Sequence, residues 1–199
     1  MESEYRSDEQ ASELIHGNIE VTMQVLEALP AAINDCAAQI VQSLLNDKKV
    51  VCCGSGQSAA LSQIFSANLL NRFQYERPSL PAVNISADAT TLTAITSDSS
   101  FQDVFANQIR ALGQPGDSLL LITCGSSNAL LQAIQSAHDR EMTVIAINSQ
   151  DSQDISALLL PEDLELRVPS SNRARIAEAQ LLIINCICEL VDQQLFGGY

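Results

Sequence analysis

The residues most able to do chemistry follow a short apolar segment near the first quarter of the chain. The apolar run 50–53 leads into the small-residue loop 54–58 and then directly into helical sequence. Glycines let such a backbone turn and approach an oxyanion, and Ser55 and Ser58 add hydroxyl donors. The helix N-terminus supplies free N–H groups and partial positive charge. The pattern predicts a phosphate-binding loop, although a glycine after a strand can also serve only the turn.

A second hydroxyl-rich loop follows another apolar segment. The run 118–122 ends in Thr123-Cys124-Gly125-Ser126-Ser127-Asn128 and continues as an apolar helix. In a parallel sheet both loops lie at the carboxyl ends of strands, where doubly wound folds bind ligands. The sequence therefore predicts one shared anion site from the two loops. Its residues are Ser55, Gly56, Ser58, Thr123, Cys124, Gly125, Ser126 and Asn128.

Composition bounds the class of protein. The 199 residues are 46% hydrophobic, which suits one globular unit and excludes a disordered chain. With 24 acidic and 10 basic residues the net charge is -14, so we expect no direct binding to nucleic acid or to anionic membrane surfaces.

The sequence also indicates a compartment. Residues 1–10 are polar and acidic, unlike a secretory signal, and the apolar runs are shorter than the ~20 residues of a membrane span. Six cysteines occur without a Cys-x-x-Cys pair, which favours reduced, buried thiols over a metal or disulfide set. We therefore expect a cytoplasmic protein.

Apolar periodicity predicts an α/β fold. Helices and strands alternate along most of the chain, as in a three-layer sandwich with a mainly parallel sheet. We expect one domain over 1–199, with an N-terminal helical pair in 1–47 and an α/β core with a C-terminal helix in 48–199. The expected helices are 12–29, 31–45, 58–73, 89–96, 101–112, 127–139, a short one within 151–160, and 173–194; the expected strands are 49–53, 82–85, 118–123, 143–147 and 163–168.

The last helix is apolar on nearly every side over 181–188. A terminal helix of that kind needs cover from several directions. The first helix offers an apolar stripe at Ile15, Ile19 and Leu26. We expect the two helices to form an intersubunit helical bundle in a homo-oligomer.

The two loops, together with 71–73, 76–78 and Arg167-Val168-Pro169, resemble SIS (sugar isomerase) domains of the phosphoheptose isomerase branch. The resemblance spans nearly the whole chain and implies a flavodoxin-like fold and a tetramer. Within the branch, the chain is most similar to adaptors that bind the replication initiator DnaA. The segments that carry this finer similarity are 26–30, 77–82, 110–113 and 185–190.

The resemblance also implies where an isomerase would keep its chemistry. Such enzymes use a Glu on the helix after the first loop and a His on the last helix, with another His and a Gln completing a zinc site. These positions fall on Asn68, Asn185, Ile64 and Ala177, respectively. An amide exchanges no proton near neutral pH, and Ile and Ala carry no ligand atom. We therefore expect no catalytic pair, no metal and no cofactor.

Other residues could still act on a sugar phosphate. Asp98, at an acidic position of the family, and Glu178 remain candidate acid/base groups, and Asp98 joins the expected sugar-phosphate site. His16 and His138 look like structural surface residues. Positions that carry hydroxyl side chains in the family are Cys124, Gly125 and Asn128 in this chain. The resemblance therefore implies that only about half of the phosphate-binding hydroxyls are retained. The pocket either binds a sugar phosphate or is a vestige that holds water or a buffer anion.

A partner surface is expected at the C-terminus. Leu195, Phe196 and Tyr199 place three large apolar side chains beside two glycines, after an expected helix end at Gln194. Leu195 and Phe196 either bind a partner or staple the tail onto a neighbouring subunit. The sequence thus leaves three functions: a DnaA-binding adaptor, a sedoheptulose 7-phosphate isomerase of ADP-heptose synthesis, and a sugar-phosphate sensor.

Overall fold

A computed structural model describes residues 2–197 of the chain, with side chains from residue 8 onward. Five strands form one parallel sheet in the order β2-β1-β3-β4-β5. Their bounds are β1 Val50–Gly54, β2 Ala82–Asn84, β3 Ser118–Ile122, β4 Thr143–Ser149 and β5 Leu164–Val168. β1 and β3 are buried at every residue, as expected for central strands covered on both faces.

The strand order reverses direction at β1. The chain adds β2 on one side of β1 and then β3, β4 and β5 on the other. A crevice opens at the carboxyl ends of the two strands that flank such a reversal. The register pairs Gly54 with Ile122, so the loops that follow β1 and β3 begin side by side.

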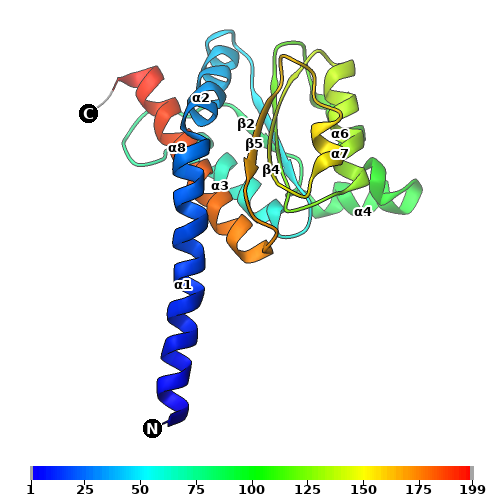
Figure 1. Cartoon of the computed structure of the whole chain (residues 1–199). Coiled ribbons are helices and arrows are strands. Elements are labelled where there is room, and N and C mark those ends of the chain that lie inside the picture. The colour runs from blue at the N-terminus through cyan, green and yellow to red at the C-terminus, as the bar shows by residue number, and fades with distance from the viewer. Residues whose placement is uncertain (1, 198–199) are drawn as a thin grey trace.

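Helices cover both faces of the sheet (Figure 1). α2 (Pro30–Leu45), α3 (Ser58–Leu70) and α8 (Arg173–Phe196) pack on one face. α5 (Val104–Leu112), α6 (Asn128–Asp139) and α7 (Gln153–Ser156) pack on the other, with η1 (Phe101–Asp103) and α4 (Ala89–Asp98) beside them. The layers confirm the predicted three-layer α/β sandwich.

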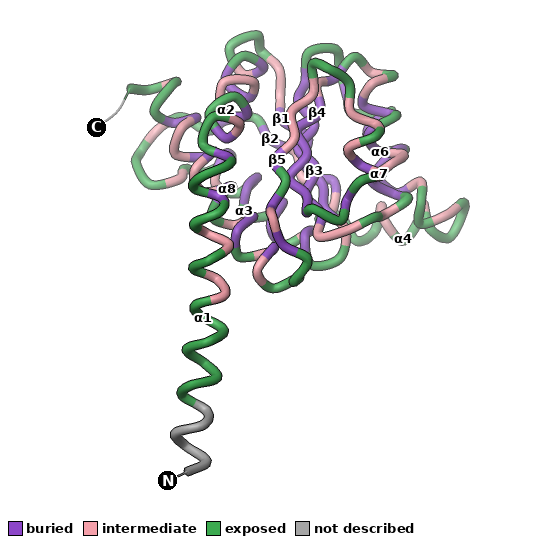
Figure 2. Tube along the Cα trace, viewed as in Figure 1, coloured by how far each residue is buried: buried purple, intermediate pink, exposed green. Residues whose placement is uncertain are grey.

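The strand residues alternate between two apolar cores, because successive side chains of a strand point to opposite faces. Cys52, Leu120 and Ile145 face the α2, α3 and α8 layer. Val51 and Leu119 face the α5 and α6 layer. Figure 2 shows this interior as buried trace in the centre of the sandwich.

The first helix behaves differently from the others. α1 (Glu2–Ala28) packs on the body through its C-terminal half, where Val25 is buried and Asn18 donates to Glu178 of α8, and its N-terminal half projects away from the sandwich (Figure 1). Large apolar side chains lie exposed along it: Leu14, Ile15, Ile19, Met23 and Leu26. Across the described residues no helix has the length and apolar content to cross a membrane.

Several element bounds differ from the prediction. α1 begins at Glu2 rather than near residue 12, because its polar first turns still favour a helix. α3 ends at Leu70, not residue 73, and the expected helix 101–112 is divided into η1 and α5. α8 continues to Phe196 and ends where Gly197 adopts a φ of 84°. Leu195 and Phe196 therefore belong to the helix, and the expected end at residue 194 was wrong.

Candidate functional site

The two predicted loops enclose a pocket of about 650 Å³ at the carboxyl ends of β1 and β3. Seven of the predicted residues line it: Ser55, Gly56, Ser58, Thr123, Cys124, Gly125 and Ser126. Gln57, Ser127, Arg173 and Ala174 complete the lining. The crevice predicted from the strand order is thus present, and it is lined mainly by small and hydroxyl-bearing residues.

The first loop is held against the start of α3. A Cβ added to Gly54 would lie 2.4 Å from the Ser58 carbonyl oxygen, so only glycine allows this approach. Gly56 adopts a φ of 58°, in the left-handed region. The buried Ser58 hydroxyl lies 3.5 Å from the Cys124 sulfur in the other loop. The close turn therefore places a serine side chain at the junction of the two loops.

The second loop is fixed by its own side chains and by α8. The Thr123 hydroxyl accepts a hydrogen bond from the Gly125 N–H at 3.1 Å and donates one to the Gly125 carbonyl. Gln180, which is fully buried on α8, donates to the Thr123 carbonyl at 2.6 Å and to the Ile147 carbonyl at 3.1 Å. These bonds tie the ends of β3 and β4 to the last helix.

The electrostatics of the pocket favour an anion. α3 and α6 begin at its two loops, and neither has a side-chain hydrogen bond at its N-cap, so their partial positive charge faces the pocket without a side-chain acceptor. Arg173 adds a full positive charge from the first turn of α8, and its guanidinium has no hydrogen-bond or ion-pair partner among residues 8–197, whose side chains are described. Asp154 introduces one carboxylate nearby, which accepts from the Ser126 hydroxyl.

Two predicted ligand residues lie outside this lining. Asn128 is exposed in the first turn of α6, and Asp98 is exposed at the last residue of α4. The prediction missed Arg173 and Gln180. Arg173 could have been found, because it opens the helix that follows β5 and so begins at the same edge of the sheet as the two loops.

Asn68 and Asn185 lie on the facing helices α3 and α8, away from the loop pocket. The half-buried Asn68 amide donates to the Cys188 sulfur at 3.8 Å, and Asn185 is also half-buried. Ile64 is 39% exposed on α3. Glu178 is exposed and accepts from Asn18 of α1 at 2.6 Å, so this carboxylate does not face the pocket. No group of three His, Cys, Asp or Glu residues in the described chain is placed to hold a metal.

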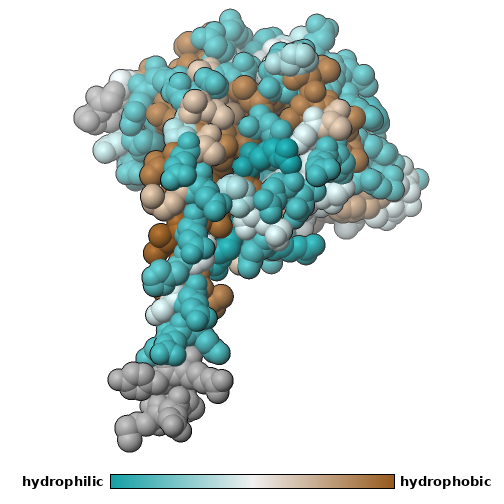
Figure 3. Space-filling view, viewed as in Figure 1, coloured by the Kyte–Doolittle hydropathy of each residue, from teal (hydrophilic) through white to brown (hydrophobic). Residues whose placement is uncertain are grey.

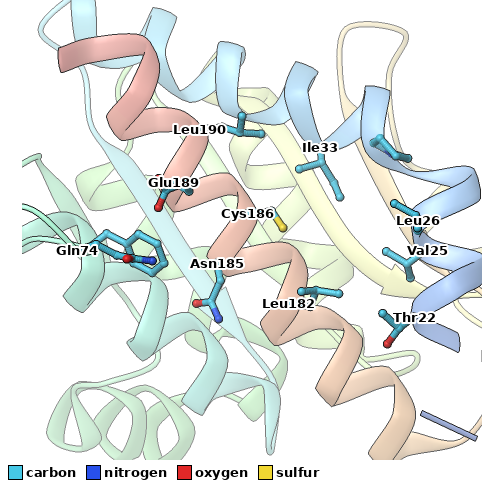
Figure 4. A pocket seen from close by; sticks show the side chains of 12 residues that line it. Thr22, Val25, Leu26, Ile33, Gln74, Leu182, Asn185, Cys186, Glu189 and Leu190 are labelled. Carbon is cyan, nitrogen blue, oxygen red and sulfur yellow. The ribbon is translucent and has the colours of Figure 1, made fainter. Parts of the chain in front are cut away.

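Asn185 instead lines an apolar groove of about 750 Å³ between α1, α2, α8 and the segment 73–74. Figure 4 shows Asn185 and Gln74 on one side of α8, and Cys186 and Leu182 on the side that faces α1 and α2. Leu182 is 39% exposed, whereas Ile183 is fully buried in the chain's own core. The chain's own core thus covers only part of α8, and the predicted intersubunit bundle stays a prediction.

The groove continues into the exposed stripe of α1. In the space-filling view, apolar side chains appear along α1 and in the recess between α1 and the body (Figure 3). Leu26 belongs to both the groove and the stripe.

The remaining predicted residues have mixed outcomes. His16 is exposed, but His138 was wrongly expected at the surface: its ring is largely buried and its Nε2 lies 2.7 Å from the buried Asp163 carboxylate. Leu195 is half-buried against the main core, and Phe196 is 38% exposed. Tyr199 lies outside the described residues.

The cysteines are free thiols. Cys36, Cys52, Cys53 and Cys188 are buried, while Cys124 and Cys186 are half-buried. Burial raises the pKa of the Cys36, Cys52 and Cys188 thiols to about 12. These groups are therefore neutral and unreactive near neutral pH.

Known proteins are similar to this chain in sequence and in fold. The SIS domain profile matches residues 15–149. A phosphoheptose isomerase of Chromohalobacter salexigens is 49% identical over 184 residues, covering 92% of this chain and 93% of the relative. The DnaA initiator-associating protein DiaA of Photorhabdus laumondii is 47% identical over 180 residues, covering 90% and 92%.

A solved structure agrees with these relatives. The phosphoheptose isomerase of Francisella tularensis has a TM-score of 0.91 and 39% identity, over 94% of this chain and 98% of that one. The fold and the sequence comparisons therefore agree: the chain belongs to the SIS-domain family.

Proposed function

We propose that the protein is a non-catalytic SIS-domain adaptor that binds DnaA and regulates the initiation of replication. Relatives named DiaA at 47% and 48% identity over most of the chain support this role. A cytoplasmic location is part of the proposal, because a replication initiator works on the chromosome. The anion pocket would persist as a vestige of sugar-phosphate binding.

The observation that carries the proposal is the pair Asn68 and Asn185. The resemblance implies a Glu and a His at these positions, which would take and return the proton that an aldose–ketose isomerisation moves. Both side chains are amides, which remain neutral and transfer no proton near pH 7. The thiol that Asn68 contacts, Cys188, has a pKa raised to about 12 and offers no replacement base.

The proposed adaptor is a homotetramer. The apolar groove beside α8 and the stripe of α1 share Leu26, and the stripe leaves several large apolar side chains exposed on one helix, as interaction surfaces do. A second copy that lays its own α1 along the groove would cover both. Four copies of one DnaA-binding surface would then act together, which raises the avidity for an initiator that itself oligomerises.

The proposed partner surface is the end of α8. Phe196 is its exposed apolar residue, and Leu195 supports it from the core side. Because Leu195 contacts the core, its truncation would also lower stability. Phe196→Ala is therefore the sharper test of partner binding than a double substitution.

The main alternative is a phosphoheptose isomerase. It is favoured by the relative of that name at 49% identity and by the anion pocket with Arg173 at its wall. It would need another acid/base pair, and the exposed Asp98 and Glu178 both lie outside the pocket lining. A sensor that binds a sugar phosphate without turnover would keep the same pocket.

One preparation tests both roles. Immobilised protein is incubated with DnaA from the organism that encodes the chain, and the same batch is assayed with sedoheptulose 7-phosphate. We expect DnaA capture and no turnover. Phe196→Ala should abolish capture, while the matched control Phe101→Ala, 52% exposed beside the opposite face of the sheet, should not.

Turnover at the rate of an authentic isomerase, or no capture by the wild-type tetramer, would overturn the adaptor role. Capture that survives Phe196→Ala would instead move the partner surface elsewhere.

A further inference from the structure

A buried arginine joins the C-terminal ends of the facing helices α3 and α8. The Arg77 side chain is only 3% exposed, and its Nε donates to the Asp192 carboxylate of α8 at 2.9 Å. Its two terminal nitrogens donate to the Leu69 and Asn68 carbonyls of α3, each at 2.7 Å. One guanidinium therefore contacts the last turns of both α3 and α8.

Contacts of this kind suit the C-terminal end of a helix. The last carbonyls of a helix lack partners within the helix and favour a nearby positive charge. Arg77 supplies that charge to α3 through the planar fork of donors that only arginine has. Its further bond to the Pro78 carbonyl, at 3.0 Å, fixes the extended segment that carries it.

The tie lies one helical turn before the proposed partner surface. Asp192 is four residues before Phe196, and helix residues four apart lie on the same face. α8 ends directly after Phe196, at Gly197. Residues at a helix end fray easily, so the direction in which Phe196 points depends on how the preceding turn is anchored.

We infer that Arg77 is a positioning residue for DnaA binding: through Asp192 and the α3 carbonyls it holds the last turn of α8 so that Phe196 is presented in one orientation. The inference rests on the proposed function. A partner that binds a pre-ordered helix end avoids the entropic cost of ordering it, so loss of the tie should weaken binding even when the surface residues are intact.

Two substitutions remove different parts of the tie. Arg77→Lys keeps a charge opposite Asp192 but cannot donate to the carboxylate and to both α3 carbonyls at once. Asp192→Asn keeps an acceptor for the arginine and removes the charge. The matched control is Arg140→Lys, because Arg140 donates twice to the Gly113 carbonyl beside the other layer of helices, at 2.9 and 2.7 Å.

Two measurements separate positioning from general stability. Hydrogen exchange of the free protein reports the order of peptide 190–197, and DnaA affinity is measured at 25 °C. We expect Arg77→Lys to speed exchange in 190–197 and to weaken DnaA binding by roughly ten-fold or more, with Asp192→Asn between it and the wild type. Arg140→Lys should lower the melting temperature yet leave both readouts unchanged.

Unchanged exchange of 190–197 in Arg77→Lys would overturn the inference, as would a loss of affinity no larger than that of Arg140→Lys. If Arg77→Lys does not fold, Asp192→Asn decides by the same two readouts. If the wild type binds no DnaA, the proposed function fails, and an unchanged exchange of 190–197 would then show separately that Arg77 does not order the helix end.

Discussion

Replacing Gly54 with alanine should damage both the fold and the anion pocket. The new Cβ would lie 2.4 Å from the Ser58 carbonyl oxygen, 2.5 Å from the Ser58 carbonyl carbon and 2.9 Å from the Ala59 nitrogen. All three atoms are backbone atoms of the first turn of α3, so no side-chain rotation relieves the clash. An ordinary contact of 3.4 Å requires the start of α3 to retreat by about 1.0 Å (3.4 minus 2.4).

The cost follows from the packing around that turn. Ser58 is 1% exposed and Leu61 is buried in the core, so α3 cannot retreat freely. Overpacking of this kind costs about 1–3 kcal/mol. For a chain of this length, a loss of about 2 kcal/mol lowers the melting temperature by roughly 4–8 °C. The shift would also move the first N–H groups of α3 within the pocket, where the proposed anion would lie.

Thermal melts at one fixed protein concentration, with and without inorganic phosphate, measure both effects. Gly125→Ala is the matched control, because a Cβ there meets no atom within 4 Å and adds little strain in the same pocket. We expect Gly54→Ala to have a lower melting temperature than the wild type and a smaller rise of that temperature with phosphate. For Gly125→Ala we expect an unfolding free energy within about 0.5 kcal/mol of the wild-type value. Equal melting of Gly54→Ala and wild type would refute the close-approach argument.

Three further outcomes test the site and the assembly. Leu182→Asp, in the lining of the apolar groove, should give folded monomers in light scattering, whereas Ile183→Asp should unfold the chain because the Ile183 side chain is fully buried. An intact oligomer of the Leu182→Asp variant would contradict the proposed bundle. Iodoacetamide at pH 7.5 should modify Cys124 and spare Cys188, because burial raises the pKa of the Cys188 thiol to about 12, and phosphate should slow the labelling of Cys124. Equal labelling of the two cysteines, measured by peptide mass spectrometry, would show that burial does not set their reactivity. Gln180→Leu should lower the free energy of unfolding in urea by about 1–3 kcal/mol, since two buried carbonyls lose a donor, and an unchanged midpoint would argue against that role.

Local sequence was enough to predict the layers and the meeting of the two loops. Short apolar runs bounded by glycine, serine and asparagine predicted the five strands, because strand burial and turn chemistry depend on neighbours along the chain. The same reasoning predicted that the loops after β1 and β3 would meet, because the carboxyl ends of parallel strands lie at one edge. Seven of the residues expected from those loops line the pocket.

The remaining differences concern contacts between residues distant in sequence. Asp98 and Asn128 were expected at the site but do not line the pocket, and their part in ligand binding stays a prediction. His138 was expected at the surface, but the loop before β5 folds a buried Asp163 against its ring. Periodicity along one helix indicates which face is apolar but not which distant segment covers it.

The composition and order of residues thus determined the α/β class, the strand positions and the two small-residue loops, because these depend on local propensity and on the period of apolar residues. The tertiary structure decided what meets at each helix end: Arg173 at the pocket, Gln180 beneath it, and Arg77 between α3 and α8. The contacts of Arg173 and Gln180, and the bond from Arg77 to Asp192, join segments that are far apart along the chain, and only the packing of three layers around one sheet brings them within hydrogen-bonding distance or into one cavity.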